Sequence, residues 1–176
     1  GLGNVSGAFE ATHNGGLLRL DSRNLRFEMP RLFVEPIVLD TASARVRWER
    51  PDGRLMVRFE QVEYANAHAA GTAQGSWRAT AKGPGTIDLS ARLTRGDMRQ
   101  TYRYLPLTIE TPTREWLRWA ITQGTVDDAR LTLRGDLARF PYPDGKDGTF
   151  VFAVKGHDVN LDYADHWPPV SGIDAE

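Results

Sequence analysis

The sequence contains no cysteine among its 176 residues. A disulfide framework and a thiolate metal site are therefore excluded. This absence fits either a reducing compartment or an envelope protein built without disulfides. The sequence also lacks any run of about 18 apolar residues, so no segment is expected to span a bilayer. No signal peptide is visible.

Net charge is nearly absent as well. The 22 Lys and Arg residues almost balance the 23 Asp and Glu residues, which leaves a formal charge of -1. Without a large positive field to attract phosphates, nucleic acid is not expected as a partner. Apolar residues make up 40% and charged residues 26%, which is typical of a globular chain rather than a disordered one.

Motifs for catalysis and for metal binding are missing too. The histidines at 13, 68, 157 and 166 have no His-x-His or His-Glu-x-x-His spacing, so no metal site is predicted. There is no Gly-x-Ser-x-Gly and no Gly-x-x-x-x-Gly-Lys. The aspartates at 127, 128, 158, 162 and 165 are interpreted as turn and strand-end residues rather than paired catalytic acids. We therefore expect no catalytic residues, no enzyme activity and no cofactor.

One segment, Thr111 to Gly124, has the pattern of a helix. Thr111 can cap it, Pro112 suits the first helical position, and Gly124 can end it. An apolar stripe is formed by Trp116, Leu117, Ala120 and Ile121. The sequence predicts one short α-helix around 112–122.

Most of the remaining sequence alternates between apolar and polar residues with a period of two, which is typical of half-buried strands. The clearest hairpin joins residues 44–48 to 55–59 through Pro51-Asp52-Gly53. Asn14-Gly15-Gly16 and Asp21 to Asn24 are predicted turns that divide residues 5–29 into short strands. Sequential hairpins predict an antiparallel meander of roughly nine strands.

The predicted fold class is therefore mainly β: a long curved antiparallel sheet, as a meander, an open groove or an incomplete barrel, with one short α-helix. We expect residues 1–176 to be a single β-rich fragment of a longer chain, because the alternating pattern runs to both ends. Within it we expect a first β part over 1–105, a loop and helix over 106–124, and a second β part over 125–176. One helix can cover only a small part of such a sheet, so part of the apolar face should be open or covered by neighbouring segments.

The apolar strand residues are the candidates for a binding surface. Core packing is the default interpretation, and a hydrophobic lining for acyl chains requires that the sheet be open on that side. The candidates for this lining are Val46, Trp48, Leu55, Val57, Phe59, Ile87, Leu89, Leu131, Leu133, Phe150 and Phe152. Their placement on a concave face is a hypothesis, because alternation shows only which residues share a face within one strand.

Arginines occur mainly on the polar sides of the predicted strands. We interpret them as a solvated face with cross-strand ion pairs, and contact with anionic headgroups is the alternative. These residues are Arg45, Arg47, Arg58, Arg78, Arg92, Arg130 and Arg134.

The second half of the chain resembles a known family. Trp116-Leu117, the stretch GTVDDARLTLRGDL at 124–137 and Phe140-Pro141 are similar to the YhdP-type branch of AsmA-like proteins. The first half adds Pro30, Phe33, Leu39-Asp40 and Trp48. The resemblance continues in Gly148-Thr149-Phe150, Leu161-Asp162-Tyr163-Ala164, Trp167-Pro168 and Gly172-Ile173-Asp174. It covers nearly the whole chain, in short motifs built of structural residues.

Such a resemblance implies a long protein of the Gram-negative envelope, anchored in the inner membrane and extending into the periplasm. The family is thought to form β-sheet grooves, related to bridge-like lipid-transfer proteins, that carry phospholipids towards the outer membrane. The implied partners are phospholipid acyl chains and neighbouring segments of the full-length chain. The resemblance offers no catalytic residues, and transport by this segment alone is not expected.

Two other classes remain open. A carbohydrate-binding β-sandwich would have exposed aromatics on a flat polar face and a closed dry core. A structural or interaction scaffold in the periplasm would have neither groove nor ligand. A periplasmic hydrolase would require clustered acids with raised pKa values in a cleft.

Overall fold

The computed structural model describes residues 1–30, 33–105, 107, 109–142, 144–162 and 168–175. Of the residues named above, Asp165, His166 and the motif residues Tyr163, Ala164 and Trp167 lie outside this part of the chain.

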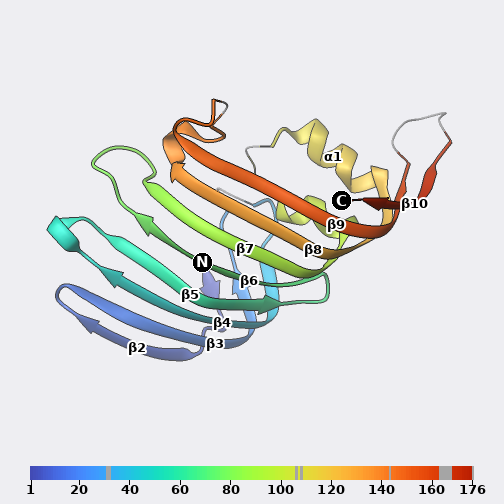
Figure 1. Cartoon of the computed structure of the whole chain (residues 1–176). Coiled ribbons are helices and arrows are strands. Elements are labelled where there is room, and N and C mark those ends of the chain that lie inside the picture. Colours follow the sequence, from blue (N-terminus) through green and yellow to red (C-terminus); the bar gives the residue numbers. More distant parts are fainter. Residues whose placement is uncertain (31–32, 106, 108, 143, 163–167, 176) are drawn as a thin grey trace.

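Within the described residues, ten strands form one curved antiparallel sheet (Figure 1). Its order is β1-β3-β4-β5-β6-β7-β8-β9-β10, with β2 paired to β3, so neighbours in the chain are almost always neighbours in the sheet. The sheet is open, which confirms the predicted fold class. The strands are β1 (Leu2–Gly3), β2 (Gly7–Thr12), β3 (Gly15–Phe27), β4 (Ile37–Glu49), β5 (Met56–Ala65), β6 (Ala69–Arg78), β7 (Thr86–Asp97), β8 (Ile121–Asp136), β9 (Gly148–Leu161) and β10 (Val170–Ala175).

The predicted hairpin between residues 44–48 and 55–59 is confirmed. Val46 lies opposite Phe59 and Trp48 opposite Val57, and the short 3-10 turn η1 (Pro51–Gly53) joins β4 to β5. The predicted turn at Asp21 to Asn24 is wrong, because β3 continues through it as a strand. Continuous pairing along β4, with Asp21 opposite Ser43, overrides the local turn preference.

The helix α1 (Thr111–Ala120) confirms the predicted short helix around 112–122, but the predicted cap at Thr111 and the predicted end at Gly124 are wrong. Glu110 occupies the cap position without a side-chain hydrogen bond, and Thr111 is already helical. The helix ends at Ala120, and β8 begins at the next residue, where Ile121 lies opposite Leu161 of β9. Pairing with β9 therefore stops the helix before Gly124, which lies inside β8.

The helix α1 and the 3-10 segment η2 (Met98–Tyr104) pack against one end of the sheet (Figure 1). Met98 fills the space above a glycine of β8, since a Cβ at Gly124 would lie 3.0 Å from its Sδ. Beneath this cover, Val126 and Ala129 of β8 and Val159 of β9 are buried. A third 3-10 turn, η3 (Leu137–Arg139), follows β8. The rest of the sheet has no comparable layer among the described residues.

The turn between β5 and β6 depends on the buried side chain of Asn66. Its Oδ1 accepts hydrogen bonds from the backbone N–H groups of His68 (2.9 Å) and Ala69 (2.8 Å). Its Nδ2 donates to the backbone carbonyl of Val38 and to the Tyr104 hydroxyl, both at 2.9 Å. One amide thus joins β4, β6 and η2 with all of its hydrogen-bonding capacity in use.

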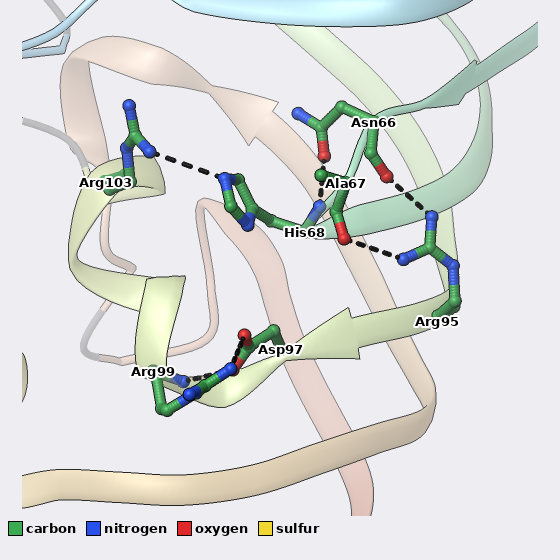
Figure 2. Close-up of polar contacts among 7 residues, drawn as sticks. All are labelled: Asn66, Ala67, His68, Arg95, Asp97, Arg99 and Arg103. Carbon is green, nitrogen blue, oxygen red and sulfur yellow. Dashed lines mark hydrogen bonds and ion pairs between the residues drawn. The ribbon is translucent and has the colours of Figure 1, made fainter.

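Arg95 of β7 holds the same turn from the other side (Figure 2). Its guanidinium donates to the carbonyl of Asn66 at 2.6 Å and to that of Ala67 at 3.1 Å. Asp97, two residues further along β7, donates its backbone N–H to the carbonyl of His68. The turn is therefore anchored to β7 as well as to β4.

We expect Asn66→Ala to lower the free energy of unfolding by about 2–3 kcal/mol, because it leaves buried backbone groups without hydrogen-bond partners. Urea unfolding followed by circular dichroism measures this loss. Gln74→Ala, at an exposed position of β6, should change stability by less than about 0.5 kcal/mol. Equal losses in the two variants would contradict the role given to Asn66.

Candidate functional site

The strand register brings the predicted lining residues onto one side of the sheet. Residues directly opposite each other in an antiparallel pair share a face. One row runs from Val46 through Phe59, Gly75, Leu89 and Leu133 to Phe150. A second row runs from Trp48 through Val57 and Trp77 to Ile87, and Leu131 lies opposite Phe152. We call this side the apolar face.

Leu55 is the one predicted lining residue outside a strand. It precedes β5, is half-buried, and accepts a hydrogen bond from the backbone N–H of Ala79 at 2.8 Å. It therefore continues the β5–β6 pairing at the border of the apolar face.

The apolar face is partly covered by its own aromatic rings. Trp48 lies over Gly16 of the neighbouring strand and stacks on Phe9, with ring centroids 5.3 Å apart. Phe59 lies over Gly75, where a Cβ would be 3.0 Å from its ring. Rings that lie across glycines shield the backbone and strengthen the pairing. Trp48 and Phe59 are half-buried, whereas Phe150 and Phe152 are 47% and 63% exposed.

The strand arginines lie on the opposite side, which we call the polar face. Asp128 of β8 bridges Arg92 and Arg130, which lie directly opposite each other. A second ion pair joins Arg134 to Asp88 at 3.0 Å. The hydrogen bond from Arg92 is the main cause that holds the pKa of Asp128 below its ordinary value. These contacts agree with the predicted cross-strand ion pairs.

A hollow also lies on the polar face. It has a volume of about 760 Å³ and crosses the sheet from β3 to β8. Its walls include Arg19, Arg45, Arg92 and Arg130, and Gln61 lies in its middle strand. Sequence reasoning missed this hollow and left Arg19 unassigned.

The alternation of apolar and polar residues changes phase within β5, and this change could have located the hollow from the sequence. In β5 the apolar residues shift from odd positions, Val57 and Phe59, to even ones, Val62 and Tyr64. The structure places a bulge at Gln61, whose φ is 50°, and both neighbouring strands shift register there. A bulge bends a strand locally, and this one lies where the sheet is hollowed.

A smaller pocket of about 170 Å³ lies beside the Asn66 turn. Arg103 forms an ion pair with Glu35 at 2.8 Å and lies 3.4 Å from Nε2 of His68 (Figure 2). These groups join η2 to the turn and to the segment before β4. Among the described residues no three His, Asp or Glu side chains are grouped so that they could hold a metal ion.

The comparisons with known proteins identify the family. A family model described as YhdP protein matches residues 1–176. The chain belongs to the YhdP family. The match confirms the resemblance inferred from the sequence, and it supports a role among the AsmA-like proteins and a place in the envelope. No curated protein and no solved structure matches this YhdP chain. No helix in the described part of the chain is both long and apolar enough to cross a membrane.

We expect Asp127→Asn to lower the pKa of His157 in an NMR titration. Nδ1 of His157 lies 2.7 Å from Oδ2 of Asp127, and this hydrogen bond is the main cause that raises the pKa of His157 above 6.5. A raised pKa in the folded state means that the pair stabilises the fold below about pH 6.5. That contribution is lost as the pH rises through the folded-state pKa.

The stability difference between the native chain and Asp127→Asn should therefore be larger at acidic than at alkaline pH. Asp158→Asn is the control, because Asp158 lies 3.7 Å from Nε2 of the same ring and contributes less to the pKa shift. An unchanged His157 pKa in Asp127→Asn would refute the assignment.

Proposed function

We propose that this part of the YhdP chain is non-catalytic and uses its apolar face to hold phospholipid acyl chains during transport between the inner and outer membranes. The observation that supports this most directly is the continuity of the apolar face. Paired residues from Val46 of β4 to Phe150 of β9 share it, and α1 and η2 cover it at only one end.

Burial against such a surface favours acyl chains. Each CH₂ removed from water contributes about 0.8 kcal/mol. The backbone of the sheet is already hydrogen-bonded between strands, so the surface offers an acyl chain few unpaired polar groups. The phosphate headgroup would remain at the border of the apolar face, where water can still solvate it.

The exposed aromatic residues support the same proposal. Phe9, Phe150 and Phe152 are each more than two-fifths exposed although they lie on the apolar face. A contiguous exposed apolar surface usually marks a binding site for a partner or a membrane component. Here we infer phospholipid, and neighbouring segments of the full-length chain would continue or cover the face in the periplasm.

The alternative of a carbohydrate-binding sandwich has less support. A sandwich buries one face of each of two packed sheets, whereas the described strands belong to a single sheet. A structural scaffold remains the second candidate, and the presence or absence of bound lipid distinguishes it from a lipid carrier.

The test compares two double variants of the same strand. Phe150→Asp with Phe152→Asp places two charges on the apolar face, whereas Val151→Asp with Ala153→Asp places two charges on the other face. All four positions are exposed, so neither variant should unfold the protein, which circular dichroism verifies. We expect native mass spectrometry and lipid extraction to find phospholipid with the native chain and with the second variant, and a loss of at least about tenfold in the first.

Two outcomes would oppose the proposal. A native chain that purifies from bacteria without lipid would favour the scaffold. Equal lipid loss in both double variants would show that added charge, rather than the apolar face, controls the association.

A further inference from the structure

The polar face contains pairs of arginines that lie directly opposite each other on neighbouring strands. The pairs are Arg19 with Arg45, Arg47 with Arg58, and Arg92 with Arg130. Like charges in directly opposed positions destabilise a sheet. The chain has 23 acidic and 22 basic residues, so its composition does not force these pairings.

In the described part of the chain, one of the three pairs shares an acidic partner, whereas Arg47 and Arg58, like Arg19 and Arg45, form no ion pair. Arg92 and Arg130 share the carboxylate of Asp128. Arg19 and Arg45 form no hydrogen bond or ion pair with any described residue. Glu60 lies opposite Arg45 in the register, yet the two side chains form no ion pair. The guanidinium groups of Arg19 and Arg45 therefore lie on neighbouring strands, with N–H donors that form no hydrogen bond to a described residue.

The hollow provides space in which Arg19 and Arg45 can bind a ligand. Arg19 and Arg45 line it from β3 and β4, and Arg92 and Arg130 line it from β7 and β8. Four arginines and one acid, Glu63, give the lining a net formal charge of +3. The other polar lining groups are hydroxyls and amides of Ser, Thr and Gln residues, which bind neutral polar groups. Its volume of about 760 Å³ is that of a small-molecule site.

We propose that this hollow binds a phosphate-bearing polar molecule, with the phosphate held by Arg19 and Arg45. The guanidinium fork matches phosphate oxygens in bidentate geometry. A phosphate between the two groups also removes the repulsion that the register imposes. The neutral donors across the hollow then contact the alcohol portion of the ligand. The phosphate can belong to a soluble phosphate ester or to a lipid headgroup.

This site is separate from the proposed acyl-chain surface, since the two use opposite faces of the sheet. The Phe150→Asp with Phe152→Asp variant should therefore bind phosphate ligands as the native chain does. The proposal of lipid binding on the apolar face and the proposal of phosphate binding in the hollow are therefore tested independently, and either can be refuted while the other holds.

The first experiment is calorimetric titration of the chain with glycerol 3-phosphate and with inorganic phosphate. Arg19→Gln with Arg45→Gln should weaken glycerol 3-phosphate binding by at least about tenfold. Arg47→Gln with Arg58→Gln is the matched control, because it removes the same charge from an opposed pair on the same face that does not line the hollow. That variant should bind within about twofold of the native chain.

Thermal unfolding at low salt gives an independent readout. Without ligand, Arg45→Gln should raise the melting temperature by about 1–2 °C, because it relieves repulsion with Arg19. Glycerol 3-phosphate should raise the melting temperature of the native chain and not that of the Arg19→Gln with Arg45→Gln variant.

Sedimentation with phosphatidylcholine vesicles, with and without phosphatidylglycerol, identifies the source of the phosphate. Loss of phosphatidylglycerol-dependent binding only in the Arg19→Gln with Arg45→Gln variant assigns the hollow to a lipid headgroup. Loss of glycerol 3-phosphate binding without any change on vesicles assigns it to a soluble ester. Equal loss in both double variants, or no calorimetric binding by the native chain, overturns the proposal.

Discussion

The structure depends on the register of backbone hydrogen bonds between consecutive antiparallel strands. No second sheet packs against this one among the described residues, so the ladder and a small packed end keep the strands in order. A shift of one residue in any pair would move the apolar side chains of that strand to the other face. Aromatic rings lying over glycines, such as Phe59 over Gly75, favour the native register because only that register supplies the glycine beneath the ring.

The bulge at Gln61 shows how the register adapts without losing the two faces. Phe59 and Val62 are three residues apart, which in a regular strand would place them on opposite sides. The extra residue returns Val62 to the apolar face, opposite Ala73. The same irregularity lies in the hollow on the polar face. One inserted residue thus preserves the apolar surface and shapes the polar one.

The two faces offer different chemistry to ligands. In the described part of the chain the apolar face is open, because α1 and η2 cover only the end around Val126 and Val159. The polar face holds ion pairs at Asp128 and Asp88, whereas Arg19 and Arg45 have no acidic partner among the residues that the structure describes. A single sheet can therefore present an apolar surface on one side, for which we propose acyl chains as the ligand, and a cationic hollow on the other.

The sequence by itself determined most of the strands, the hairpin at Pro51–Gly53 and the apolar residues that share a face within the regularly alternating strands. Alternation with period two is a local property, and a chain of short hairpins leaves an antiparallel meander as the simplest topology. The tertiary structure decided where α1 ends, that Asp21 to Asn24 stays in a strand, and that Arg19 lies opposite Arg45. Each of these depends on which residue of another strand is the partner, and that is set by register across the sheet rather than by neighbours in the chain.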